Sequence, residues 1–124
     1  MTKILSVDDS ATMRRIIGRA VAVMGYEFLE AENGLQALDL LPQHAPDLDL
    51  IILDVNMPEM DGFETLTRIK ADARYKNIPV MMVTTESDRT RIVQAIQAGA
   101  ANYVTKPFNQ EDLSSKIAQC LGCF

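Results

Sequence analysis

Five polar side chains in this sequence are of the types that together handle phosphoryl groups and divalent cations. Three of them are carboxylates. Carboxylates held at ~4 Å repel each other by about 4 kcal/mol per pair at an effective dielectric constant of ~20, and a divalent cation would remove that cost. The offered ligands are all oxygens, with no Cys or His among them, which favours Mg²⁺ over zinc. Each of the five lies within two residues of the end of a short apolar segment: Asp8, Asp9, Asp54, Thr84 and Lys106.

The lysine and the threonine extend this chemistry from metal binding to phosphoryl transfer. Lys106 adds a fixed positive charge, which together with a metal would neutralise a phosphoryl group. Thr84 could donate a hydrogen bond to the phosphoryl oxygens. An aspartate can itself carry a phosphoryl group, so one of the three carboxylates is a candidate nucleophile.

Each of these residues also has an ordinary explanation when it is taken alone. A single aspartate after a strand is usually a turn residue or a helix cap. Lys106 alone would be a surface charge, and Thr84 alone a strand residue. The joint arrangement, strand by strand, is much rarer than any single member, and clusters of titratable groups mark functional sites. The set therefore indicates a site at one edge of a sheet.

Five short apolar segments alternate with stretches of helical periodicity. The segment 27–31 alternates between polar and apolar residues, which suits an edge strand. The segments 50–53 and 80–83 are apolar throughout, which is typical of parallel strands that are covered on both faces. The predicted strands are 4–7, 27–31, 50–53, 80–83 and 102–104.

The helices follow from apolar residues at helical spacing, which we expect to face the core. Ser10 is the predicted cap of the first helix and Gly25 its end, whereas Pro42 should stop or kink the second helix. The fourth helix is predicted over 87–99, and Asn109 should cap the fifth. The apolar stripes are Met13, Ile16, Ile17, Ala20, Val21 and Met24; Leu35, Leu38 and Leu41; Phe63, Leu66 and Ile69; Ile92, Val93 and Ile96; and Leu113, Ile117 and Leu121.

This order of strands and helices predicts the class of the fold. Right-handed crossovers between alternating strands and helices build a doubly wound parallel sheet with helices on both faces. In such α/β sheets, ligands bind at the carboxyl ends of the strands, where the strand order reverses. The length of 124 residues predicts a single domain over 1–124.

Composition excludes several classes of partner. Twelve Lys and Arg against 17 Asp and Glu give a net charge of −5, which argues against a nucleic-acid footprint. No apolar run approaches the ~20 residues that are needed to cross a bilayer. Two carboxylates follow the first apolar segment before the core of a signal peptide could form. We therefore expect a cytoplasmic protein that contacts neither nucleic acid nor membrane.

Two cysteines near the end of the chain form a C-x-x-C pair, Cys120 and Cys123. Such a pair can be a redox site or half of a zinc site. A redox pair needs a strand before it and a helix after it, and a zinc site needs two further ligands. The only histidine is His44, which we predict to be solvated in a loop between two prolines. Reduced thiols without a catalytic role are the better interpretation.

The residues 7–10, 53–62 and 106–108, together with Thr84, resemble the receiver domains of two-component response regulators. The likeness covers residues 3–121. The segments 7–17 and 102–108 are most similar to the single-domain chemotaxis regulators of that family. The resemblance implies a flavodoxin-like fold with five parallel strands in the order 2-1-3-4-5.

The resemblance also implies a role for each site residue. Asp54 would be the phosphoacceptor. Asp9 and Asp54 would bind Mg²⁺ directly, Asp8 through water, and Asn56 through its backbone carbonyl. Lys106 and Thr84 would contact the phosphoryl oxygens, the Lys106–Pro107 bond would be cis, and Tyr103 would be the switch aromatic. Asn56 and Glu86 would tune the attack of water on the phosphoryl group.

The implied function is a signalling switch rather than an enzyme acting on outside substrates. A histidine kinase would donate a phosphoryl group to Asp54, and the surface formed by 87–99, 102–104 and 109–121 would then bind a target, for example a flagellar motor switch protein. A phosphate sink or a phosphorelay intermediate stays open as an alternative.

Two other classes of protein fit the residues less well. A Mg²⁺-dependent aspartyl-phosphate phosphatase would want a second acid where Asn56 stands, and a cap domain to enclose its substrate. A flavodoxin would need a phosphate loop after the first strand, where Asp8 and Asp9 would repel the phosphate. No G-x-x-x-x-G-K-[S/T] loop for a nucleotide is present.

Overall fold

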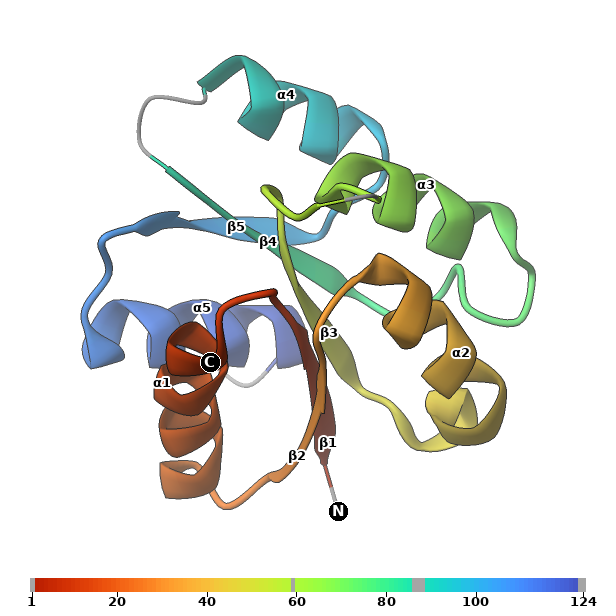
Figure 1. The fold of residues 1–124 in the computed structure, drawn as a ribbon. Helices are drawn as coiled ribbons and strands as arrows, with labels where there is room; N and C mark the ends of the chain where they lie inside the picture. The colour runs from red at the N-terminus through yellow and green to blue at the C-terminus, as the bar shows by residue number, and fades with distance from the viewer. Residues whose placement is uncertain (1, 59, 86–88, 123–124) are drawn as a thin grey trace.

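A parallel sheet forms the centre of the computed structural model, which describes residues 2–58, 60–85 and 89–122 (Figure 1). Within these residues the sheet has five strands in the order β2-β1-β3-β4-β5, which confirms the predicted class and order. The strands are β1 (Lys3–Val7), β2 (Glu27–Ala31), β3 (Leu50–Asp54), β4 (Val80–Thr85) and β5 (Asn102–Lys106). β4 and β5 run two residues further than predicted, so Thr84 and Lys106 lie within strands.

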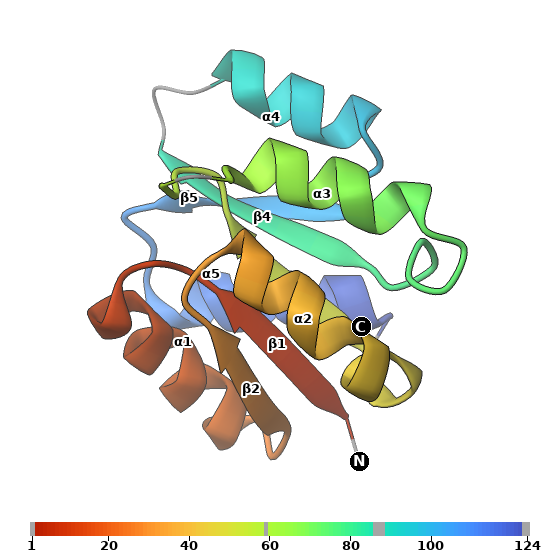
Figure 2. The ribbon, with the colours of Figure 1, turned by 45° about the vertical axis from the view of Figure 1, so that its right-hand side comes forward.

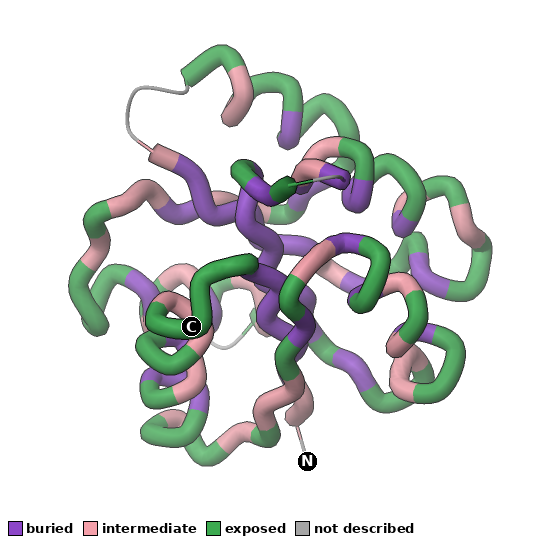
Figure 3. Tube along the Cα trace, in the orientation of Figure 1, coloured by how far each residue is buried: buried purple, intermediate pink, exposed green. Residues whose placement is uncertain are grey.

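Helices cover both faces of the sheet (Figures 1 and 2). α1 (Ala11–Val23) and α5 (Gln110–Leu121) pack on one face. α2 (Gly34–His44), α3 (Gly62–Ala71) and α4 (Arg89–Gln97) pack on the other. A short 3₁₀ helix, Ala45–Asp47, follows α2. β1, β3 and β4 are buried between the two layers, whereas β2 is a partly exposed edge strand as predicted (Figure 3).

The predicted helix ends of α1 and α5 are confirmed. The side chain of Ser10 accepts a hydrogen bond from the backbone N–H of Met13, and the side chain of Asn109 accepts one from Asp112. Such caps satisfy backbone donors that have no partner within the helix. Gly25 follows α1 with a φ of +81°, the left-handed conformation that glycine adopts at low cost.

α2 differs from the prediction at its end. Pro42 does not stop this helix, which runs on to His44, so the histidine is the half-buried last residue of a helix rather than part of a loop. The proline removes one backbone hydrogen bond in the last turn, where the helix is about to end in any case. Burial of Leu41 beside it holds this turn against the core.

Part of the predicted apolar stripes of α1, α2 and α4 faces solvent instead of the core. In α2 the buried apolar residues are Ala37 and Leu41, and in α4 the buried residue is Ala95. Four apolar residues of α1, α2 and α4 face outward: Ile16, Leu35, Val93 and Ile96 are 45%, 46%, 55% and 46% exposed. The stripes of α3 and α5 pack against the core as predicted.

No helix among the described residues is long and apolar enough to span a membrane.

Candidate functional site

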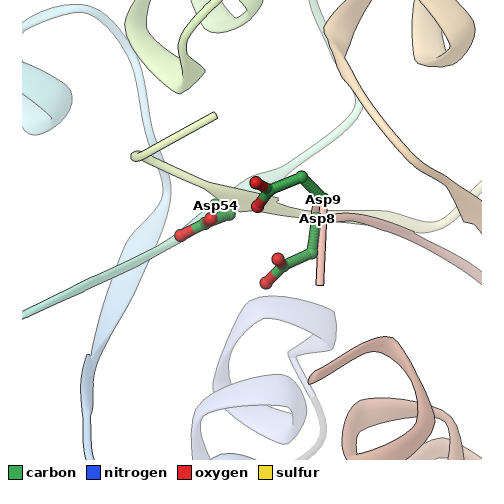
Figure 4. A group of neighbouring side chains, drawn as sticks. All are labelled: Asp8, Asp9 and Asp54. Atoms are coloured by element: carbon green, nitrogen blue, oxygen red, sulfur yellow. The ribbon is translucent and has the colours of Figure 1, made fainter. Parts of the chain in front are cut away.

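The carboxyl ends of β1 and β3 bring the three predicted aspartates together. In the sheet register Val7 of β1 is opposite Leu53 of β3. Asp8 and Asp54 are the residues that follow this pair on the two adjacent strands. One carboxylate oxygen each from Asp8, Asp9 and Asp54 lie within 4.8 Å of one another (Figure 4). The structure therefore places all three acids at one edge of the sheet.

Two of these carboxylates are almost completely buried. Asp8 is 1% exposed and Asp54 3% exposed, whereas Asp9 is exposed to solvent. Asp8 Oδ1 accepts a hydrogen bond of 2.9 Å from the backbone N–H of Ser10. Asp8 Oδ2 is buried and has no hydrogen-bond donor within the described part of the chain. Buried charged oxygens without donors are costly, and a cation would satisfy this one.

Lys106, at the end of β5, supplies the positive charge of the site. Its Nζ lies 3.3 Å from Asp54 Oδ1 and 3.9 Å from Asp8 Oδ2. The Lys106–Pro107 peptide bond is cis, as the resemblance implies. Three carboxylates and this ammonium leave a formal charge of 1 − 3 = −2. The donor set of hard oxygens and this charge both fit a divalent cation such as Mg²⁺.

Burial changes the acidity of both inner aspartates. The pKa of Asp54 is raised to about 6, chiefly by loss of solvent and next by the charge of Asp8, against lowering contributions from Lys106 and the backbone N–H of Asn56. Burial likewise raises the pKa of Asp8, which the Ser10 N–H and Lys106 partly oppose. In the absence of metal these carboxylates thus hold protons more tightly than ordinary aspartates.

This acidity predicts an unusual pH dependence of stability. Between about pH 4 and pH 6 the folded, metal-free protein keeps a proton that the unfolded chain loses, so its free energy of unfolding falls as the pH rises. For Asp54 the loss should reach roughly 3 kcal/mol by neutral pH. Urea unfolding with chelator at several pH values from about pH 3 to about pH 7 measures this loss. Asp54→Asn should remove the part of this pH dependence of the free energy of unfolding that is due to Asp54. An equal slope in Asp54→Asn and wild type would contradict the assignment.

The other predicted residues lie on neighbouring strands. Thr84 is buried in β4, one residue beyond Val83, which is opposite Asp54 in the register. Tyr103 in β5 is half-buried, with Lys116 Nζ 5.2 Å from the centre of its ring. Asn56 is exposed just after β3, beside the acidic cluster in sequence. Glu86 falls outside the described residues, so its tuning role stays a prediction.

Two residues at the site were not found from the sequence. Arg14 of α1 donates a 2.6 Å hydrogen bond from a terminal guanidinium nitrogen to the carbonyl of Asp8. Gly62 begins α3 so close to β3 that a Cβ there would meet the carbonyl oxygen of Asp54. Its N–H donates to the carbonyl of Val55 at 2.9 Å. For Gly62 the signal was a glycine directly after a capping Asp61, and for Arg14 there was none.

The cysteine pair is only partly described. Cys120 is a half-buried free thiol whose pKa is raised by burial, the opposite of a reactive thiolate. Cys123 lies outside the described residues, so its predicted lack of a role is untested.

Comparison with known proteins gives the same interpretation as the geometry. Residues 4–118 match the family described as the response regulator receiver domain. The chain is 44% identical to the chemotaxis protein CheY1 of Helicobacter pylori, with 97% of each chain covered. It is 45% identical to the chemotaxis protein CheY of Pseudomonas aeruginosa, covering 93% of this chain and 92% of that one.

Among solved structures, the chemotaxis response regulator CheY4 of Vibrio cholerae superposes with a TM-score of 0.90 at 36% identity, over 98% of this chain and 99% of that one. The match therefore extends over sequence and fold alike. The chain belongs to the response regulator receiver domain family, as a CheY-like chemotaxis regulator that acts as a signalling phosphoacceptor rather than as a conventional enzyme.

Proposed function

We propose that Asp54 accepts a phosphoryl group from a phosphorylated histidine kinase in the cytoplasm, and that the change at Asp54 alters a target-binding surface. A carboxylate oxygen of Asp54 attacks the phosphorus, the P–N bond to the kinase histidine breaks, and its electron pair returns to the imidazole. The observation that carries this proposal is the contact of Lys106 with a buried carboxylate at 3.3 Å inside an acidic cluster. The whole chain, 1–124, would act as one receiver domain.

Asp8, Asp9, Asp54 and the backbone carbonyl of Asn56 would hold Mg²⁺. When bound, the metal supplies positive charge that stabilises the phosphoryl oxygens and offsets the repulsion among the carboxylates. The chain's own residues do the rest. β3 aims Asp54 at the donor, Lys106 offsets the developing charge, and burial of Asp8 and Asp54 strengthens each of these electrostatic interactions.

Transfer from the kinase tests this function. A histidine kinase carrying a radiolabelled phosphoryl group should lose its label to this chain when Mg²⁺ is present and keep it when a chelator is added. The candidate kinases are those encoded near this chain's gene. Label that moves equally well without any divalent cation would contradict the proposed metal site, and label that never moves from any candidate kinase would contradict the proposed donor.

The output surface that we propose consists of α4, β5 and α5, and its target would be a chemotaxis component such as a flagellar motor switch protein. A groove of about 610 Å³ lies there, lined by Arg89, Ile92, Val93, Tyr103 and Thr105. Val93 in this lining and Ile96, further along α4, are exposed apolar side chains. Apolar side chains around a groove that contains an aromatic ring suit a protein partner.

Thr84 would connect Asp54 with this surface. It is opposite Thr105 in the register of β4 and β5, and Met82, two residues earlier on β4, is opposite Tyr103. A hydroxyl that moves to donate to a phosphoryl oxygen would vacate space beside β5, into which the ring of Tyr103 could turn. One hydrogen bond and one buried ring amount to a few kcal/mol, so we expect a partial switch with some active population beforehand.

Thr84→Ala should therefore still accept a phosphoryl group at Asp54, but the conformational change at Tyr103 that follows should be weak. We expect the phosphorylation-dependent NMR shifts of Tyr103 to shrink several-fold, because the donor that couples the two residues is gone. Thr67→Ala, which removes an exposed threonine of α3, is the matched control and should respond like wild type. A full Tyr103 response in Thr84→Ala would mean that the coupling runs through other residues.

Asn56 and Glu86 should affect loss of the phosphoryl group more than its gain. Water must approach the phosphorus in line and past these two positions, whereas a donor brings its own contacts. Bulkier or oppositely charged substitutions should therefore change the dephosphorylation half-life while the rate of labelling by acetyl phosphate stays nearly constant. Timed quenching and intact-mass measurement follow both rates. Unchanged half-lives across several substitutions would show that these positions do not control water.

A further inference from the structure

We propose that Arg14 is a positioning residue for the metal ligands: held by Glu30, its guanidinium fixes the turn that carries Asp8 and Asp9 in the geometry a divalent cation needs. The inference rests on the proposed function, since the cation is the Mg²⁺ of the phosphotransfer site. Arg14 and Glu30 belong to α1 and β2, two elements that supply none of the proposed ligands.

Two nitrogens of the Arg14 guanidinium make hydrogen bonds. A terminal nitrogen donates to the carbonyl of Asp8 at 2.6 Å, and Nε donates to a carboxylate oxygen of Glu30 at 2.8 Å. The side chain of Arg14 is only 13% exposed, although that of Glu30 is 54% exposed. A rigid, planar guanidinium fork that is held by a carboxylate through one nitrogen directs its other donor more tightly than a single flexible ammonium would. The Asp8 carbonyl is therefore held in one direction.

That carbonyl belongs to the peptide that joins the two aspartates. On the other side of the peptide, Asp8 is tied by its own N–H to the carbonyl of Ala31 at 3.1 Å and by Oδ1 to the N–H of Ser10 at 2.9 Å. Asp9 is exposed, so the direction of its carboxylate depends on the backbone that carries it. From α1, Arg14 holds the carbonyl of the peptide that leads into Asp9. Mutation of a residue that hydrogen-bonds to a metal ligand commonly lowers the metal affinity by about 10- to 100-fold.

Charge alone predicts the opposite effect on the metal. A guanidinium near an anionic cluster repels a cation, so its removal should tighten Mg²⁺ binding if charge were its only contribution. Loss of positioning should weaken binding. The sign of the change therefore separates the two explanations. Arg15 gives the matched control, because it is an exposed arginine of the same helix that lines the same surface pocket of about 400 Å³ as Arg14.

The experiment titrates Mg²⁺ into the full chain by isothermal titration calorimetry at constant ionic strength. Arg14→Gln should weaken the affinity about tenfold, and Arg14→Lys, which keeps the charge but loses the fork, should also weaken it. Arg15→Gln should leave the affinity unchanged or slightly tighter. At saturating Mg²⁺ the rate of labelling by acetyl phosphate in Arg14→Gln should return close to that of wild type, because the defect lies in assembling the ligands.

Glu30→Gln provides a second route that leaves Arg14 in place. It should weaken Mg²⁺ binding on its own but add little in the Arg14→Gln background, because Glu30 acts through Arg14. Two results would overturn the inference: a folded Arg14→Gln that binds Mg²⁺ as tightly as wild type or more tightly, or losses of affinity that are fully additive in the double variant. In either case, Mg²⁺ binding by wild type would leave the proposed function intact. Absence of Mg²⁺ binding in wild type would overturn both.

Discussion

Asp54→Asn should take up no phosphoryl group from acetyl phosphate, whereas the wild-type chain should take up one. The amide keeps the shape of the side chain but has no anionic oxygen with which to attack phosphorus. Asp54 is the buried carboxylate nearest Lys106, so no neighbour is equally placed to replace it. Intact-mass measurement with Mg²⁺ present compares the two proteins, and the bound group should be labile in both acid and base.

The control for this loss is Asp39→Asn, which makes the same chemical change at an exposed position of α2. It should be labelled at the wild-type rate. Undiminished labelling of Asp54→Asn would assign the phosphoryl group to another residue. Asp9 and Asp8 would then be the first to substitute, because they are the other acids whose oxygens lie within 4.8 Å of the site.

The sheet could be predicted because β3 and β4 each begin with four consecutive apolar residues. β3 consists of four aliphatic residues before Asp54, and such a segment is stable only where both faces are covered. The hydrophobic pattern ends β4 and β5 two residues too early, because Thr85 and Lys106 are polar. Pairing with the adjacent strand extends them, and the pattern of a single segment carries no information about that pairing.

The outward-facing side of α4 was predicted less well, for a different physical reason. A period of 3.6 shows which residues share a face but not how closely the helix approaches the sheet. Here Ala95 is the buried contact, so Val93 and Ile96 face solvent. The residues interpreted as core thus belong to the surface on which we propose that a target binds.

The aspartates and the lysine of the site were predictable because the topology alone brings the carboxyl ends of parallel strands to one edge. Arg14 was not, since its role depends on the reach of a long side chain across to β2 and back to the Asp8 carbonyl. The raised pKa of Asp54 also required the structure, because its largest cause is burial. The charges could be counted in the sequence, but their solvation could not.

Mg²⁺ should raise the free energy of unfolding of the wild-type chain, by about 2.7 kcal/mol at a concentration 100 times its dissociation constant. Asp9→Ala should lose most of this response, because it removes the one solvent-exposed carboxylate of the three that we propose as ligands. Without metal the same variant should be slightly more stable than wild type, since one repulsive charge is gone. Urea unfolding with and without Mg²⁺ measures both effects.

The response to Mg²⁺ should also depend on pH in a defined direction. Below the pKa of about 6 that burial gives Asp54, a proton competes with the metal for the same carboxylate, so the stabilisation should shrink between about pH 7 and about pH 5. Asp39→Ala, at the exposed position on α2, should retain both the response and its pH dependence. A Mg²⁺ response of the same size in Asp9→Ala and in wild type would show that Asp9 is not a ligand, and the metal would then have to be held by Asp8, Asp54 and the backbone carbonyl of Asn56.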